Sequence, residues 1–466
     1  MRAIPELSYC YYLANPHIAA QGPYDKKFLD RYVLPHVNTL VASGTPPAED
    51  FVAWRREGRQ WLANAGLPGI SAATAPSVDE VYAAWGGNAG VTQQGYSGLI
   101  VDEFINAGAE HYRAWTGGME RLYGDSRFAD RTFYAWCGEL FRMPQGLEFG
   151  RALLGHKGRF VWEVYLGEDA TEQAARRRIR RALQFPLTEW EEALPTTREH
   201  MVVCLGYMSA PPESLNVNPA VDYNVYMDMQ MQLLATEPAF WKLYGVMQYS
   251  ASYTDEEAVR WAYRMFRHYC IDGKRERLIQ SPYELPYLRN PDFAKGTEGW
   301  RVERAEPGSV SIQRMEGLSW LQGRYPKTSQ GDQYLRFKRC ANGPNRVTQT
   351  IRGLTAGGVY SLKLLSADMK QLDVKSVLGV RLQIDGADVN KDLSFQYPYP
   401  SNYAHELGPY NKDHPAWINY HRVVFSAHGE TAELSISDWA ADGTPGGPEG
   451  QEIGVNFVEV QPYLLP

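Results

Sequence analysis

Four carboxylates stand at or near the ends of short apolar runs, the positions at which a sheet presents side chains to a cleft. They are Asp102, Glu103, Glu139 and Glu163. Two or three carboxylates that face one cleft can hydrolyse a glycosidic bond, because one protonates the leaving oxygen while another attacks or activates water. The chain has no G-x-S-x-G or H-E-x-x-H motif and no clustered His and acid set for a metal. Carboxylate chemistry is therefore the first hypothesis.

Glu163 is the most informative of the four because of its neighbours. The bulkier apolar residues of the run 160–166 share one face, and Glu163 shares the other with Val161 and Tyr165. The bulkier face should meet a helix layer, which leaves Glu163 pointing inward. A buried carboxylate is costly unless it is paired, protonated or in use. Glu163 is therefore either a functional acid or a structural one bonded to Arg or Lys.

The other three acids are ambiguous. Asp102 and Glu103 are adjacent, so they point to opposite faces of a strand and only one enters a cleft directly. Both faces of the run 98–101 are apolar, so the pattern does not choose between them. Alternatively, Asp102 caps the following helix and Glu103 favours its first turn. Glu139 lies either on a cleft loop or on the exposed surface.

A repeated unit of strand, loop and helix positions these acids. The expected strands are 7–13, 38–42, 60–64, 97–102, 132–137, 160–166, 201–207 and 244–249. Helices are expected over 25–34, 48–57 and 221–242. Three more are expected: one that the capping box Ser77-x-x-Glu80 opens, one that follows the fourth strand and ends at about residue 122, and one from Thr254-x-x-Glu257 to residue 269. Eight such units predict an α/β fold, a closed (β/α)8 TIM barrel over residues 1–280. A doubly wound open sheet is the alternative, but no G-x-G-x-x-G or P-loop follows these strands.

In a barrel, the reactive groups lie at the C-terminal ends of the strands and in the loops that follow. Besides the acids, these positions hold amides and aromatic rings that suit the binding of sugars. The candidates for substrate binding are Tyr11, Asn15, Trp136, Glu139, Tyr207, Gln248 and Tyr249, and Asn64 ends the third strand.

The pattern changes near residue 285. After a linker at 281–286, short alternating runs separated by turns predict an all-β, jelly-roll-like sandwich over residues 287–466. The runs are 310–312, 346–351, 360–365, 380–384, 420–425, 433–436 and 455–460. An aromatic, proline-rich insertion extends from Gln396 through Tyr403 and Tyr410 to Tyr420. It is a surface for stacking on sugars, a loop over the barrel cleft, or a set of rings that packs the sandwich onto the barrel.

The composition of the chain limits the classes of molecule that the protein is expected to bind. The 466 residues include 47 Lys plus Arg against 54 Asp plus Glu, a net charge of −7 that speaks against nucleic acid. No apolar stretch is long enough to cross a bilayer. The arginines of 176–181 follow several acids and indicate a solvated helix face. The N-terminus has no charged segment followed by an apolar one. We therefore expect a secreted or periplasmic protein whose signal peptide lies outside this numbering, with the cytoplasm as the alternative.

Two segments resemble known families. Gly95-Tyr96-Ser97-Gly98-Leu99-Ile100-Val101-Asp102-Glu103-Phe104 resembles the fourth strand of TIM-barrel glycoside hydrolases, which ends in an acid/base residue. The resemblance implies that Glu103 is the general acid/base and that Asp102 tunes or replaces it. These enzymes often place their nucleophile after strand seven, where Leu205-Gly206-Tyr207-Met208-Ser209 has no acid. The partner would then be Glu163 or Glu139.

The second resemblance covers about residues 290–466. The segment 290–300, with Asn290, Phe293 and Gly299-Trp300, is similar to the opening of carbohydrate-binding β-sandwich modules. Residues 349–351 and 354–362 resemble their middle strands, and 455–460 resembles the last strand, where an Asp is common and this chain has Asn456. The resemblance implies that the sandwich can hold a structural calcium. It implies no cofactor for catalysis.

The sequence therefore predicts a glycoside hydrolase that acts on a polysaccharide or oligosaccharide. Glu103 would protonate the glycosidic oxygen, Glu163 would act as nucleophile or as base for water, and Asp102 would set the charge balance. Two alternatives stay open. One is a non-catalytic carbohydrate-binding protein on a barrel scaffold, and the other is a lyase that acts on acidic sugars.

Overall fold

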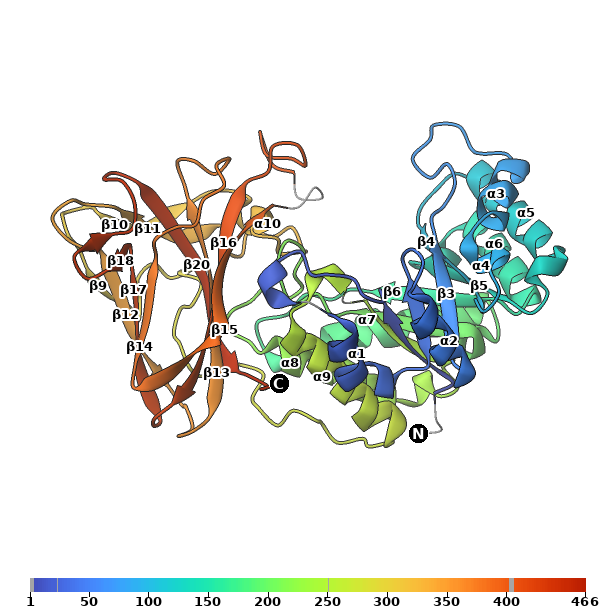
Figure 1. The fold of residues 1–466 in the computed structure, drawn as a ribbon, viewed down its shortest axis with the longest axis horizontal. Coiled ribbons are helices and arrows are strands. Elements are labelled where there is room, and N and C mark those ends of the chain that lie inside the picture. Colours follow the sequence, from blue (N-terminus) through green and yellow to red (C-terminus); the bar gives the residue numbers. More distant parts are fainter. Residues whose placement is uncertain (1–3, 23, 250, 402–405) are drawn as a thin grey trace.

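The computed structural model describes residues 4–22, 24–249, 251–401 and 406–466, so Tyr403 lies outside the described residues. Eight parallel strands close a barrel in chain order, as the sequence predicted (Figure 1). They are β1 (Glu6–Cys10), β2 (Thr39–Ala42), β3 (Gln60–Ala65), β4 (Gly98–Phe104), β5 (Thr132–Cys137), β6 (Arg159–Val164), β7 (Met201–Gly206) and β8 (Gly245–Tyr249). The pairing of β1 with β8, which places Tyr9 opposite Gln248, completes the ring.

Side chains of each barrel strand alternate between the interior and the helix layer. In β6, Phe160 and Trp162 pack in the outer layer, whereas Val161 belongs to the interior cluster. Glu163 has the parity of Val161, so it points into the barrel as the alternation predicted. The same parity places Asn64, Asp102 and Trp136 on the interior side of their strands.

The helices form a layer around the barrel. They are α1 (Lys26–Tyr32), α2 (Ala48–Arg56), α3 (Val78–Gly86), α4 (Ala89–Thr92), α5 (Ala109–Tyr123), α6 (Pro144–Gly155), α7 (Glu172–Ala193), α8 (Tyr223–Thr236) and α9 (Glu256–Met265). Short 3-10 turns follow several elements, among them η1 (Ala19–Gln21) and η4 (Leu140–Arg142), and the π-helical turn η8 (Phe266–Ile271) continues α9. None of the helices among the described residues combines the length and apolarity that a membrane span needs.

Two helix ends differ from the expectation. The helix expected over 221–242 stops at Thr236, because Pro238 forces the preceding Glu237 into an extended conformation. The last helix is capped by Asp255 instead of Thr254, since the Asp255 side chain accepts a hydrogen bond from the Ala258 backbone N–H. The Thr254 hydroxyl instead donates to the Tyr207 carbonyl oxygen at 2.5 Å.

The C-terminal region is an antiparallel β-sandwich, as the short alternating runs predicted. One sheet has the order β10 (Val310–Arg314), β11 (Gln333–Lys338), β20 (Glu452–Pro462), β13 (Val359–Asp368), β16 (Trp417–Ala427) and β15 (Ala387–Pro400). The other has the order β14 (Arg381–Asp385), β17 (Thr431–Ser437), β12 (Arg346–Arg352) and β9 (Arg301–Glu303). A short helix, α10 (Leu318–Leu321), and a hairpin of β18 (Trp439–Ala441) and β19 (Thr444–Pro445) lie outside the two sheets. Leu362, Phe425 and Leu434 belong to the core between the sheets.

The sandwich packs against one side of the barrel (Figure 1). Ile18, in the loop after β1, is buried in a cluster with Leu321, Tyr399 and Tyr420 of the sandwich. The Tyr399 hydroxyl donates to the Gln322 carbonyl oxygen at 2.9 Å. Tyr399 and Tyr420 of the aromatic insertion therefore pack the sandwich onto the barrel, which was one of the expected alternatives.

Candidate active site

Strand β4 ends in a bulge that separates its two acids. Pairing with β5 shifts between Val101 and Phe104, and Glu103 has a φ of 66°, which side chains rarely adopt. Asp102 keeps the inward parity of Ile100 and is half-buried, whereas Glu103 is exposed. The ambiguity left by the apolar run is thereby resolved in favour of Asp102 as the residue that enters the barrel.

The pKa of Asp102 is raised to about 6, first by burial and second by the negative charge of Glu103. Hydrogen bonds from the Glu103 backbone N–H and from the Tyr11 side chain oppose this rise. Asp102 is therefore mostly ionised at neutral pH, and its hydrogen-bonding neighbour is Tyr11, the residue that directly follows β1.

Glu163 lies on the other side of the same interior and is half-buried. Its Oε1 accepts a hydrogen bond from the Tyr165 hydroxyl at 2.7 Å. Burial raises the pKa of Glu163 to about 7 against the lowering effect of this bond, and the charges of Asp102 and Glu103 add to the rise. No cation lowers the pKa of either carboxyl. The structural alternative, an ion pair of Glu163 with Arg or Lys, is thus not found among the described residues.

Aromatic rings cover the acids. Tyr249, at the end of β8, has ring centroids at 5.7 Å from Trp136, 5.7 Å from Tyr165 and 6.3 Å from Tyr11. Two buried polar atoms beside these rings, Trp136 Nε1 and Asn64 Oδ1, have no hydrogen-bond partner among the described residues. A buried donor and a buried acceptor without partners cost free energy unless water or a ligand binds them.

The remaining candidates lie elsewhere. Tyr207 belongs to the outer hydrophobic layer, and Gln248 has the outward parity of Val246. Asn15 is exposed in the loop after β1. Glu139 forms an ion pair with Arg142, which also bonds Glu189 of α7. Tyr207 and Gln248 thus point away from the barrel interior that Asp102 and Glu163 face, and Asn15 and Glu139 stay predictions.

Sequence reasoning missed two residues near the acids. Glu213 lies in the long loop 207–222 between β7 and α8, is half-buried, and has a pKa raised by burial to about 7. Its charge raises the pKa of Tyr249 and of Tyr325. The expectation of no acid directly after strand seven was correct for 205–209, but the loop carries one further on. Tyr325 comes from the sandwich and had no signal in the sequence.

Asp292 and Asn456 of the sandwich are already engaged by an arginine, and the structural calcium that the resemblance implied stays a prediction. Asp292 and Asn456, at the two ends of the resembling region, both bind the guanidinium of Arg324. Its Nη1 and Nη2 donate to Asp292 Oδ2 and Oδ1 at 2.7 and 2.8 Å, and Nη2 donates to Asn456 Oδ1 at 2.5 Å. The side-chain oxygens of Asp292 and Asn456 therefore already bind a buried positive charge. No group of three or more His, Cys, Asp or Glu in the described part of the chain has the geometry of a metal site.

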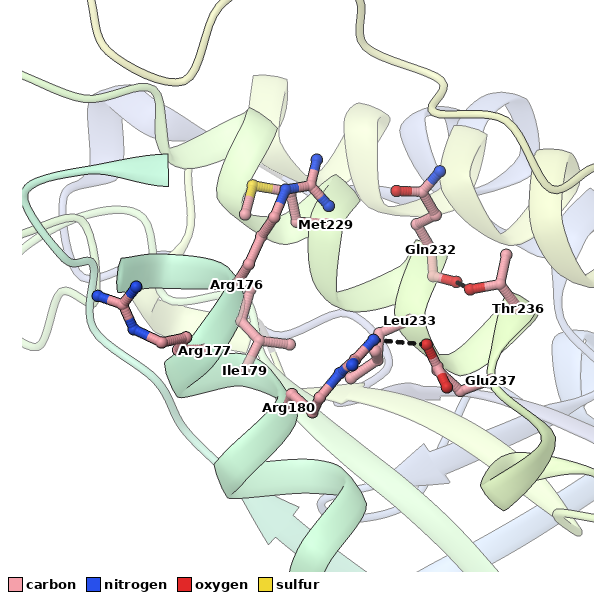
Figure 2. Close-up of a pocket in the computed structure, with 9 residues that line it drawn as sticks. All are labelled: Arg176, Arg177, Ile179, Arg180, Met229, Gln232, Leu233, Thr236 and Glu237. Atoms are coloured by element: carbon pink, nitrogen blue, oxygen red, sulfur yellow. Dashed lines mark hydrogen bonds and ion pairs between the residues drawn. The ribbon is translucent and has the colours of Figure 1, made fainter. Parts of the chain in front are cut away.

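A hollow on the outer helix layer holds the arginines of α7. Figure 2 shows it between α7 and α8, lined by Arg176, Arg177 and Arg180 of α7 and by Gln232 and Glu237. Arg176 pairs with Glu172 at 2.7 Å, and Arg180 pairs with Glu237 at 2.7 Å. The arginine run is thus a locally neutralised helix face, as the charge pattern predicted.

No protein-family model matches the chain, and no curated protein matches it in sequence. The chain is similar to catalytic domain 2 of the Group II chitinase of Ostrinia furnacalis, at 10% identity and a TM-score of 0.38, over 57% of this chain and 97% of that one. It is also similar to the glycoside hydrolase domain of PelA from Pseudomonas aeruginosa, at 12% identity and a TM-score of 0.30, over 55% and 96%. TmCBM61 in complex with beta-1,4-galactotriose matches at 13% identity and a TM-score of 0.22, over 38% and 97%.

Likenesses at these scores carry no argument about chemistry. The fold assignment rests on the closed strand order and the two packed sheets, the architecture that the resemblances implied. Any functional argument rests on the geometry of the barrel interior.

Proposed function

We propose that the protein is a glycoside hydrolase that cleaves O-glycosidic bonds in a polysaccharide or oligosaccharide, with Asp102 and Glu163 as its carboxylate pair. One observation carries the proposal. Two half-buried carboxyls with raised pKa values, on β4 and β6, face the same interior at the C-terminal end of a closed barrel, and no cation among the described residues lowers the pKa of either.

The two acids suit different steps. Glu163 has the higher pKa, about 7, so a large fraction carries a proton near neutral pH and can give it to the glycosidic oxygen. Asp102, with a pKa of about 6, is mostly ionised and can attack the anomeric carbon or take a proton from water. As the C–O bond breaks, the leaving oxygen takes the Glu163 proton and the anomeric carbon bonds either to the hydroxyl of a water or to an Asp102 oxygen. In the first route Asp102 takes the proton of that water. In the second, water then replaces Asp102 at the anomeric carbon and gives its proton to the deprotonated Glu163. Exposed Glu103, which the resemblance made the acid, instead raises the pKa of both.

The surroundings of the pair suit a sugar. Trp136 Nε1 can donate and Asn64 Oδ1 can accept a hydrogen bond, and both lack a partner among the described residues. A sugar hydroxyl can satisfy either atom. The half-buried rings of Tyr11 and Tyr249 offer apolar faces of the kind that stack on sugar rings.

The charge of the site favours neutral or amine-bearing glycans over acidic ones. Asp102, Glu103 and Glu163 repel a uronate, and no cation acts on Asp102 or Glu163 to offset the repulsion. A lyase for acidic sugars needs the substrate carboxylate to be neutralised. The site therefore supports hydrolysis better than elimination.

The test compares the two proposed acids with their exposed neighbour. Asp102→Asn, Glu163→Gln and Glu103→Gln would be assayed for release of reducing ends from soluble chitosan, cello-oligosaccharides and β-1,4-galactan, with polygalacturonate as the acidic probe. We expect turnover of at least one non-acidic probe, a loss of about 10²–10⁴-fold in kcat for the first two variants, and a loss below tenfold for Glu103→Gln.

Two results would refute the proposal. Full turnover by Glu163→Gln, with the loss confined to Glu103→Gln, would return the acid role to Glu103. Binding of the probes by the unaltered protein without any product would make it a carbohydrate-binding protein on a barrel scaffold.

A further inference from the structure

A segment of the sandwich reaches the rim of the barrel. Residues 323–325, which follow α10, pair with the loop between β7 and α8. The Ser214 backbone N–H donates to the Gly323 carbonyl oxygen at 2.6 Å, and the Tyr325 N–H donates to the Ser214 carbonyl oxygen at 2.8 Å. The two segments are thus joined by backbone hydrogen bonds, and they place Tyr325 beside the residue that follows Glu213.

Arg324 anchors this junction. Its guanidinium is buried and binds Asp292 through two hydrogen bonds, Asn456 through one, and the Val217 carbonyl oxygen of the barrel loop at 3.0 Å. A bidentate Arg–carboxylate pair has a fixed planar geometry. The side chain therefore fixes the position of Tyr325, the next residue, relative to the barrel.

Tyr325 lies at the site described above and remains open to solvent. Its ring centroid is 6.3 Å from that of Tyr165, edge to face, and Tyr165 is the residue that bonds Glu163. Tyr325 is 39% exposed although it lies near Glu163 and Glu213. Burial and the charges of both acids raise the pKa of its hydroxyl. An exposed ring beside half-buried acids is a surface on which a sugar ring can stack.

We propose that the sandwich supplies one wall of the sugar-binding cleft, in which Tyr325 stacks on a sugar unit and Glu213 accepts hydrogen bonds from its hydroxyl or amino groups. Arg324 is the positioning residue of this wall. The inference rests on the proposed function for the identity of the ligand as a glycan. It goes further, because it makes the C-terminal domain a direct contributor to substrate binding.

The test separates binding from chemistry. Tyr325→Ala, Tyr325→Phe and Glu213→Gln would be measured for kcat and KM on soluble chitosan, cello-oligosaccharides and β-1,4-galactan, and for the Kd of the same probes by calorimetry. We expect Tyr325→Ala to raise KM and Kd about tenfold with kcat within about twofold, because one stacking contact is lost. Tyr325→Phe keeps the ring and should stay within about threefold of the unaltered protein. Glu213→Gln should raise Kd about fivefold to tenfold.

Trp241→Ala is the matched control, since Trp241 is an exposed ring outside the site, 54% exposed. It should change neither constant. Arg324→Lys keeps the charge but loses the bidentate pair, so it should raise KM as Tyr325→Ala does and leave kcat within about twofold. A purely structural role of Arg324 would lower the amount of folded protein and leave KM unchanged.

The outcomes distinguish this inference from the proposed function. If folded Tyr325→Ala turns over substrate with unchanged KM and Kd, the sandwich does not contribute to binding, and the proposal of hydrolysis is unaffected. Binding without turnover that Tyr325→Ala weakens would support the wall and refute hydrolysis. Equal loss in Tyr325→Ala and Trp241→Ala would refute the wall as well, because the effect would not depend on the site.

Discussion

The two ends of the barrel interior hold the same kind of group in opposite circumstances. At the N-terminal end, Glu6 is buried and both of its oxygens are bonded. The Ser8 hydroxyl donates to Oε1 at 2.7 Å and the Tyr134 hydroxyl donates to Oε2 at 2.7 Å, with the charge of Arg159 nearby. At the C-terminal end, Glu163 accepts a hydrogen bond from the Tyr165 hydroxyl and has like charges around it.

The comparison shows that burial alone does not mark a functional acid. The pKa of Glu6 and that of Glu163 are both raised by burial. The difference lies in the neighbours. Both oxygens of Glu6 are bonded, whereas Trp136 Nε1 and Asn64 Oδ1, in the two residues that contact Tyr11 on the site side, lack partners among the described residues. Closed polar networks stabilise a fold, and incomplete ones accept a ligand.

The largest expected effect is a crossed result for alanine variants of the two acids. Glu163→Ala should lower kcat by about 10²–10⁴-fold and change the melting temperature little. Glu6→Ala leaves two buried hydroxyls without their acceptor, so it should lower the free energy of unfolding by about 2–3 kcal/mol and keep kcat within about threefold. Activity assays and thermal unfolding at one pH measure both. Loss of activity in folded Glu6→Ala would contradict the claim that Glu6 serves the fold and Glu163 serves the reaction.

The pH dependence of kcat/KM should follow the two site acids. Activity should rise through the pKa of Asp102, about 6, because that carboxyl must be ionised, and fall through the pKa of Glu163, about 7, because that one must be protonated. The profile is then a narrow bell with its maximum between pH 6 and pH 7. Glu163→Gln should lose the alkaline limb in its residual activity. A flat profile from pH 5 to pH 8 contradicts the assignment.

A smaller effect concerns stability. The pKa of Glu163 rises from 4.5 to about 7 on folding, so the folded state binds more protons than the unfolded one between these values. Stability contributed by this group is therefore present at low pH and lost as pH rises through 7. Glu163→Gln should gain about 2–4 °C in melting temperature relative to the unaltered protein between pH 5 and pH 8. A constant difference across this range would show that the Glu163 pKa is not raised.

The smallest effect extends the comparison to the sandwich, where the buried guanidinium of Arg324 binds Asp292 and Asn456. Because its guanidinium already binds Asp292 and Asn456, we expect 1 mM EDTA or 1 mM calcium to shift the melting temperature by less than about 1 °C. Arg324→Ser, which removes the internal cation, provides the contrast. A large rise in the melting temperature of the unaltered protein with calcium would refute the expectation that the Arg324 guanidinium takes the place of a bound cation.

Periodicity predicted the parts of the fold that repeat locally. Strand alternation placed Glu163 inside the barrel, since its face of β6 differs clearly from the other. Alternation did not predict which of Asp102 and Glu103 points into the barrel, because their orientations are set by the bulge in β4. Glu213 follows two prolines in a loop that has neither helical nor strand periodicity, so no local pattern predicted its position. Tyr325 reaches the site through pairing between distant segments, which no local pattern contains.

One measurement tests the central claim most directly: mass spectrometry of the products formed from soluble chitosan, cello-oligosaccharides and β-1,4-galactan in water enriched in oxygen-18. Hydrolysis through Asp102 and Glu163 places one oxygen from water in each pair of new ends, so new reducing ends should be two mass units heavier, and Glu163→Gln should form them at least a hundredfold more slowly. Intact probes would contradict the account, as would unsaturated products without the label or equal rates for the two proteins.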